Sequence, residues 1–72
     1  MELGPEGGYV KLAPRQIDVL RCSAMDLDTK GTALRLFLGV ETVKTHRHRA
    51  MEALDCRTWP GAVAKAIREG LV

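Results

Sequence analysis

Apolar residues recur along this chain at helical spacing, in four segments separated by turn-forming residues. In the first segment, Ile17, Leu20 and Ala24 stand at i, i+3 and i+7, which puts them on one face of a helix. Pro14 precedes them and is tolerated in the first turn of a helix, where its missing N–H is not needed. The pattern therefore predicts a first helix over residues 14–25.

The next two segments are joined by a short apolar corner. Asp28 is a good N-cap, so residues 29–36 are predicted to form a short second helix. Gly31 weakens this helix by roughly 1 kcal/mol relative to alanine. Residues 37–40 contain one glycine, which suits a tight turn, and a third helix is predicted over residues 41–54.

The last segment predicts a fourth helix near the carboxyl end. Thr58 can cap it, Pro60 lies in its first turn, and Gly70 ends it. One face of this helix carries four apolar side chains, Ala62, Val63, Ala66 and Ile67. No segment has the alternation of a strand, so the expected fold class is an all-α, four-helix domain.

Composition and length fit one small globular domain. The chain has 72 residues, of which 46% are hydrophobic and 28% charged, unlike a disordered chain. Residues 9–72 are expected to form the domain, after a flexible, glycine-rich tail over residues 1–8. No apolar run approaches the roughly 20 residues that span a bilayer, and no signal-peptide pattern is present. We therefore expect a cytoplasmic protein without a membrane partner, in which Cys22 and Cys56 are reduced, buried thiols.

Basic side chains concentrate in the third predicted helix. The formal net charge of +2 is too small to indicate a nucleic-acid partner by itself, so the position of the charge matters. Residues 44–49 contain no acidic side chain and hold Lys44, His46, Arg47, His48 and Arg49. On its own, such a basic run on a helix is often only a solvated face.

A helical wheel gives the third helix two faces. Val43, Ala50 and Leu54 fall together at i, i+7 and i+11 and are predicted to face the core. The second face carries Glu41, Lys44, Thr45, His48 and Glu52, and the two faces are flanked by Arg47 and Arg49. An exposed basic helix that follows a short helix and a tight turn has the dimensions to enter a DNA major groove. The sequence thus favours a helix-turn-helix domain that binds double-stranded DNA.

Two stretches of the chain stand in the order and spacing of a known family's landmarks. LAPRQIDVL, over residues 12–20, is similar to that family's opening. LFLGVETVKTH, over residues 36–46, is similar to its recognition segment, in which Thr-Val-Lys is the most characteristic tripeptide. By these motifs residues 12–72 resemble the GerE/LuxR-type helix-turn-helix domain of bacterial regulators. The resemblance implies a DNA-binding transcriptional regulator.

The resemblance also implies roles for individual residues. Lys44, Thr45 and His48 match positions that face the groove, and Thr42 matches one that binds backbone phosphate. With the two flanking arginines, the expected DNA-binding set is Thr42, Lys44, Thr45, Arg47, His48 and Arg49. The fourth helix usually makes the dimer contact in this family, which implies a homodimer with Ala62, Val63, Ala66 and Ile67 at a two-fold interface.

Several positions depart from the family's usual pattern, and four of them affect the turns and helices that support the third helix. Asp26 stands where a glycine normally ends the first helix, so an altered turn is expected there. Gly31 and Thr32 replace a usual glutamate and isoleucine, which is expected to loosen the second helix. Gly39 replaces the usual serine cap and removes a side-chain bond worth up to about 1 kcal/mol.

An enzyme is not expected. His46 and His48 stand at i and i+2 and point about 160° apart around a helix, so one zinc ion cannot bridge them. Neither cysteine has a Cys-x-x-Cys partner, and no phosphate loop or nucleophile motif is present. The sequence therefore predicts no catalytic residue, metal site or cofactor.

The alternative is a module that binds RNA polymerase or another regulator instead of DNA. Trp59 would be a natural anchor for such a partner if it were exposed. The competing interpretation is that Trp59 covers the core beside the fourth helix. Salt distinguishes the two functions, because DNA binding weakens steeply as salt rises, whereas docking through an apolar patch does not.

Overall fold

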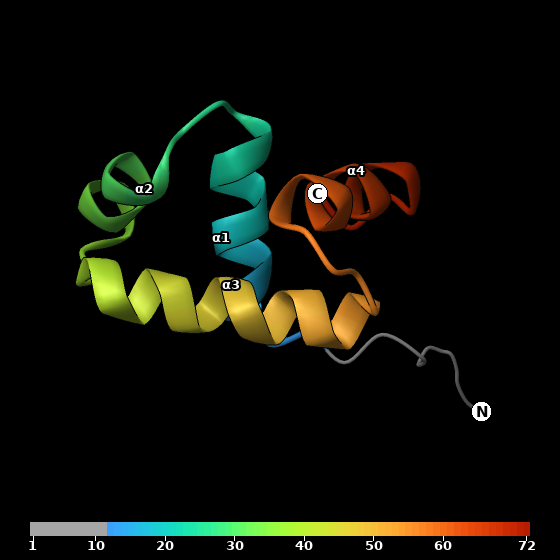
Figure 1. Ribbon diagram of the computed structural model, residues 1–72. Helices are drawn as coiled ribbons and strands as arrows, with labels where there is room; N and C mark the ends of the chain where they lie inside the picture. The colour runs from blue at the N-terminus through green and yellow to red at the C-terminus, as the bar shows by residue number, and fades with distance from the viewer. Residues whose placement is uncertain (1–11) are drawn as a thin grey trace.

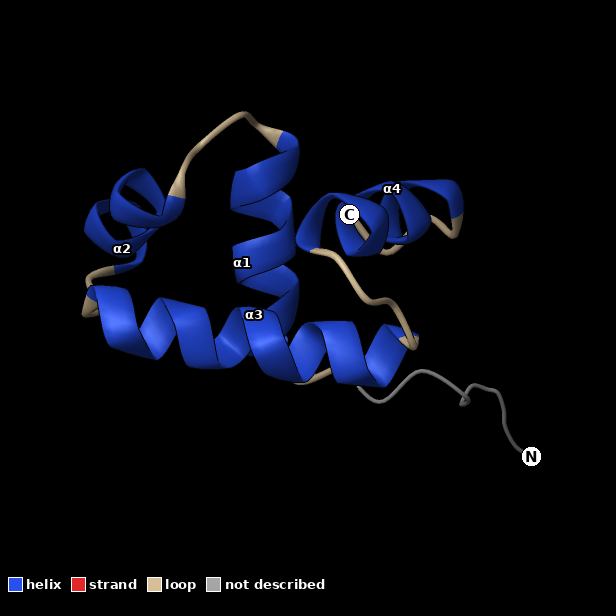
Figure 2. Ribbon diagram, in the orientation of Figure 1, coloured by secondary structure: helices blue, strands red, loops and turns tan. Residues whose placement is uncertain are grey.

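Four α-helices make up residues 12–72, the part of the chain that the computed structural model describes. They are α1 (Pro14–Ala24), α2 (Thr29–Leu36), α3 (Val40–Leu54) and α4 (Trp59–Arg68), shown in Figures 1 and 2. No strand occurs within these residues. The predicted all-α, four-helix fold class is confirmed, whereas the predicted tail over residues 1–8 lies outside the described part.

The helices are arranged around a crossing of α1 and α3. The longest helix, α3, runs along one side of the molecule, with α2 near its amino end and α4 near its carboxyl end (Figure 1). α1 packs against all three other helices, and α3 does the same. The Lys65 ammonium of α4 donates a hydrogen bond of 2.8 Å to the carbonyl of Leu54, at the last turn of α3. The three other helices thus pack against one side of α3, and its other side is exposed to solvent.

Two clusters of buried side chains form the core. Val19 of α1, Ala33 of α2 and Val43 of α3 make the first. The second joins α1, α3 and α4 through Leu20, Ala50, Leu54, Ala62 and Ala66. Trp59 packs against both clusters and so links them. The core face predicted for α3 is confirmed, because its three residues are at most 1% exposed.

Side-chain caps begin two of the helices as predicted. The Asp28 carboxylate accepts a hydrogen bond of 2.7 Å from the Gly31 N–H at the start of α2. The Thr58 hydroxyl accepts one of 3.1 Å from the Gly61 N–H at the start of α4. Gly31 suits its position, since an added Cβ would lie 3.1 Å from the capping Asp28 oxygen. Each cap satisfies a backbone donor that the first helical turn leaves unpaired.

Each of the three connections between helices in residues 12–72 contains a non-glycine residue in the left-handed conformation, and Asp55 (φ 56°) is the one after α3. Asp26 has φ 68° after α1, so the turn keeps the backbone that a glycine would adopt there. Phe37 has φ 58° and makes the corner between α2 and α3. The glycine of this corner was expected to allow the tight turn, but Gly39 is extended (φ −75°, ψ 154°) and serves as the N-cap of α3. α3 accordingly begins at Val40, one residue earlier than predicted.

None of the helices in residues 12–72 is long and apolar enough to cross a membrane.

Candidate nucleic-acid interface

The side of α3 that does not face the core is open to solvent. After Val40, the exposed residues of α3 are Glu41, Thr42, Lys44, Thr45, His48, Arg49 and Glu52. This set contains five of the six residues predicted to contact DNA. We call these five, Thr42, Lys44, Thr45, His48 and Arg49, the outward face of α3.

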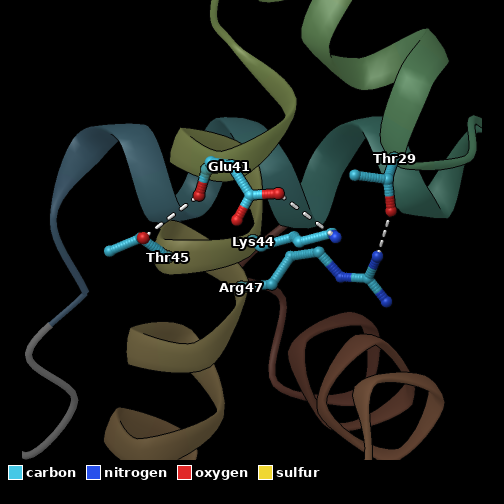
Figure 3. A network of polar contacts seen from close by, with 5 residues as sticks. All are labelled: Thr29, Glu41, Lys44, Thr45 and Arg47. Atoms are coloured by element: carbon cyan, nitrogen blue, oxygen red, sulfur yellow. Dashed lines mark hydrogen bonds and ion pairs between the residues drawn. The ribbon is translucent and has the colours of Figure 1, made fainter.

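Glu41 organises the amino-terminal part of the outward face (Figure 3). Its carboxylate lies 3.4 Å from the Lys44 ammonium, and its backbone carbonyl accepts a hydrogen bond of 3.1 Å from the Thr45 hydroxyl. Because that hydroxyl is used within the helix, the methyl group of Thr45 is the part that points outward (Figure 3). The ion pair is exposed at both ends, so it stabilises the helix by only about 0.2–1 kcal/mol and releases Lys44 easily.

A second acidic side chain stands at the other end of α3. The Glu52 carboxylate lies 3.4 Å from Nε2 of His48, which makes an ion pair only when the imidazole is protonated. Glu41 and Glu52 therefore bracket the basic segment. With these two carboxylates, the exposed side of α3 has a smaller net positive charge than residues 44–49 alone suggest. The placement of each side chain therefore matters more than the total charge.

Arg47 contacts the scaffold and does not belong to the outward face. Its guanidinium donates a hydrogen bond to the Thr29 hydroxyl at the first residue of α2 (Figure 3). The same group lies 4.9 Å from the ring centroid of Trp59, the first residue of α4. Trp59 in turn donates a hydrogen bond of 2.8 Å to the Ser23 hydroxyl of α1. These residues, Thr29, Arg47 and Trp59, form what we call the arginine clamp, which ties α3 to the start of α2 and of α4.

His46 also lies toward the scaffold. It is half-buried, and its Nδ1 atom is buried without a hydrogen-bond partner among residues 12–72. His48, two residues later, is exposed. Within the same residues no group of three or more His, Cys, Asp or Glu side chains stands close enough to hold a metal ion.

The apolar stripe of α4 divides between two surfaces. Ala62 and Ala66 are 0% exposed and pack in the core, so their side chains are not available to a second copy of the chain. Val63 is half-buried and Ile67 is 53% exposed. Of the four residues predicted for a dimer interface, Ala62 and Ala66 are covered by α1 and α3. Only Val63 and Ile67 remain accessible to a second copy.

A groove runs beside these two accessible residues. It has a volume of about 550 Å³ and separates the loop after α1 from the outer side of α4. Its apolar lining comes from Leu27, Trp59, Pro60, Val63, Ala64 and Ile67, and its polar lining from Ser23, Asp26, Asp28, Thr29 and Arg47. None of the outward-face residues of α3 lines it. Trp59 covers the core from here, as the second of the two interpretations expected, and is only partly accessible.

Comparisons with known proteins agree with this architecture. A family model described as "Bacterial regulatory proteins, luxR family" matches residues 10–66. Over 58 residues the chain is 38% identical to a protein of Bacillus subtilis (strain 168) described as "Uncharacterized transcriptional regulatory protein YxjL". The alignment covers 81% of this chain and 27% of that protein, so the chain spans about a quarter of its relative's length. The predicted resemblance is confirmed, and this chain belongs to the luxR family of bacterial regulatory proteins.

Proposed function

We propose that this chain is the DNA-binding module of a transcription regulator and that α3 enters the major groove. The observation that carries the proposal is the outward face, a row of exposed hydrogen-bonding and basic side chains on a helix held from behind by α1 and α2. A major groove about 12 Å wide admits one α-helix. The combination of this helix with a shorter one across a tight corner is typical of helix-turn-helix recognition.

The chemistry of the outward face fits distinct parts of a DNA duplex. Lys44 carries three donors for a guanine edge or a phosphate. The outward methyl of Thr45 fits the methyl group of thymine. Thr42 and Arg49 supply donors for phosphate near the helix, and the amino end of α3 adds backbone N–H groups and a positive dipole end. Regulation of transcription on bacterial DNA also implies a cytoplasmic location.

A two-fold dimer on DNA forms part of the proposal. Val63 and Ile67 supply accessible apolar surface on α4, on the other side of α1 from α2 (Figure 1). Two copies joined there would present two α3 helices to successive half-sites. We expect a weak dimer that forms mainly on DNA, because two partly exposed side chains bury little area.

Replacing one cation on α3 and one on α4 tests DNA binding by the outward face. Lys44→Ala should weaken binding to a selected DNA site by about 1–3 kcal/mol if Lys44 reads a base edge. Arg68→Ala removes the same charge from an exposed position on α4 and should change affinity much less. Fluorescence anisotropy measures both. Equal losses in the two variants would indicate non-specific attraction and contradict a role for α3 in recognition.

A protein partner such as RNA polymerase or another regulator is the second candidate, favoured by the groove beside α4. Ile67 lines the groove and is 53% exposed. Because the groove contains no residue of the outward face, a partner could dock there while α3 binds DNA. Docking through this apolar surface should change little between about 50 and 200 mM salt, over which DNA binding falls steeply. Ile67→Glu should abolish capture of such a partner and leave DNA affinity for a single half-site unchanged.

A further inference from the structure

Glu41 is an unexpected residue for a surface that approaches DNA. Its side chain is 88% exposed in the first turn of α3, next to Lys44 and Thr45. A carboxylate in this place repels phosphates, and such repulsion lowers the affinity for every DNA sequence alike. The same carboxylate becomes favourable where it accepts a hydrogen bond from a base.

The two charged groups of the Glu41–Lys44 pair have opposite hydrogen-bonding roles. The carboxylate of Glu41 only accepts and the ammonium of Lys44 only donates. In the major groove, guanine presents the acceptors O6 and N7, and cytosine presents the donor N4–H₂. In a G·C pair the guanine O6 and cytosine N4 are bonded to each other, so they lie about 2.9 Å apart. The Glu41 oxygen and the Lys44 nitrogen are 3.4 Å apart, a spacing that matches the two atoms of the base pair.

We propose that Glu41 and Lys44 together read one G·C base pair, with Glu41 accepting from cytosine N4 and Lys44 donating to guanine O6 or N7. This inference rests on the proposed function, since it assigns a base pair to the outward face of α3. In the free protein the intrahelical ion pair already places both groups side by side, although it is weak. Binding therefore replaces one exposed ion pair by two hydrogen bonds to bases and does not leave the carboxylate without a donor.

The competing account is that the pair only stabilises the helix and that Glu41 merely weakens DNA binding. The two accounts differ in the sequence preference that they predict for Glu41→Ala. If Glu41 only repels phosphate, its removal raises affinity for all sequences equally and keeps the base preference. If Glu41 reads cytosine, its removal lowers affinity for the preferred site and relaxes the preference at one base pair.

The test selects DNA sites for the 72-residue chain from a randomised duplex library and compares them with the sites of its variants. The unmodified chain should enrich a site with a G·C pair, and changing that pair to A·T should lower its affinity about tenfold, within the usual range for one base pair. In Glu41→Ala and in Lys44→Ala the same exchange should change affinity less than about threefold. Both variants should also relax the same base pair, because the two side chains read it jointly.

Glu52→Ala is the matched control. It removes the other carboxylate that brackets the basic segment and should keep the G·C preference. Circular dichroism of each variant checks that the helices are retained. A uniform gain of affinity in Glu41→Ala, with the base preference unchanged, would overturn the inference and leave the proposed function standing. Failure of the unmodified chain to enrich any site would instead overturn the proposed function.

Discussion

The arginine clamp gives the sharpest prediction about stability, because two neighbouring arginines differ in what they contact. Arg47 bonds to Thr29 and stacks over Trp59, whereas Arg49 is exposed. Replacing either one by alanine removes the same charge from α3. Only the Arg47 change cuts contacts between helices, so the two variants separate a scaffold role from a DNA-binding role.

The size of the effect follows from the two contacts that Arg47→Ala removes. A hydrogen bond from a charged donor contributes at least about 1.5 kcal/mol to the free energy of unfolding. A partly exposed cation–π contact adds about 0.5–1 kcal/mol. Thr29 can bond to water once Arg47 is gone, so no further penalty is expected. A loss of about 2 kcal/mol lowers the melting temperature of a domain of this size by about 10 °C. Arg49→Ala should lower it by only about 2 °C, as an ordinary surface change.

Thermal unfolding followed by circular dichroism, without DNA, measures both melting temperatures. Arg47→Lys sharpens the assay, because lysine keeps the charge but lacks the planar fork that bonds and stacks at once. We expect it to recover less than half of the loss. If Arg47→Ala melts within about 2 °C of Arg49→Ala, the clamp does not stabilise the fold. If Arg47→Lys restores the full melting temperature, charge alone explains the effect and the stacking argument is wrong.

Three further changes test separate parts of the account. Thr45→Val should keep the affinity for DNA, because the Thr45 hydroxyl is bonded within α3. Thr45→Ser removes the methyl group and should cost about 1 kcal/mol of binding at a site that contains thymine. If anisotropy shows the larger loss for Thr45→Val, the methyl group is not the part of Thr45 that contacts DNA. Asp26→Gly should raise the melting temperature by a few degrees, since glycine adopts φ 68° without the steric cost that a side chain brings. If calorimetry shows a lower melting temperature instead, the Asp26 carboxylate makes a stabilising contact. Ile67→Glu should leave a folded monomer that binds a two-half-site operator more weakly in sedimentation and anisotropy, and an unchanged dimer would exclude α4 as the interface.

The helix pattern of the sequence predicted the fold well because each helix carries its own local signals. Asp28 and Thr58 cap their helices through contacts three residues away, and Val43 with Leu54 marks the core side of α3 by spacing alone. Such signals involve only near neighbours in the chain, so periodicity and capping preferences are enough to find them. The family landmarks rest on the same local segments.

Positions at the edge of an apolar stripe were less predictable. On α1, Ala24 is exposed although it shares the spacing of Leu20, while Val19 beside the stripe is fully buried. On α4, Ala62 and Ala66 form the edge of the stripe that is buried in the core. Val63 and Ile67 form the other edge, which is accessible to solvent. A stripe fixes the general direction of a helix face, but the neighbouring helices decide how far around it the core extends.

The roles of Arg47 and Phe37 depend on tertiary structure or on unusual backbone. Arg47 reaches Thr29 and Trp59, which are distant in the sequence, so a basic run alone could not separate it from Lys44 or Arg49. Phe37, a residue that is 94% exposed, makes the corner of α2 and α3 in the left-handed conformation, although a glycine stands two residues later. Non-glycine residues adopt this conformation rarely, so Gly39 was the natural choice from the sequence.

Mapping the DNA-contacting surface by nuclear magnetic resonance shows which side of the molecule touches DNA. The chain, labelled with ¹⁵N, is titrated with a DNA duplex selected from the random library, and the shifts of its backbone amides and of the indole N–H are recorded. If α3 enters the groove, the largest changes should fall on Thr42, Lys44, Thr45, His48 and Arg49. The Trp59 indole N–H, bonded to Ser23, should move little. Changes centred on Trp59, Val63 and Ile67, with the outward face of α3 unaffected, would contradict recognition of DNA by this helix.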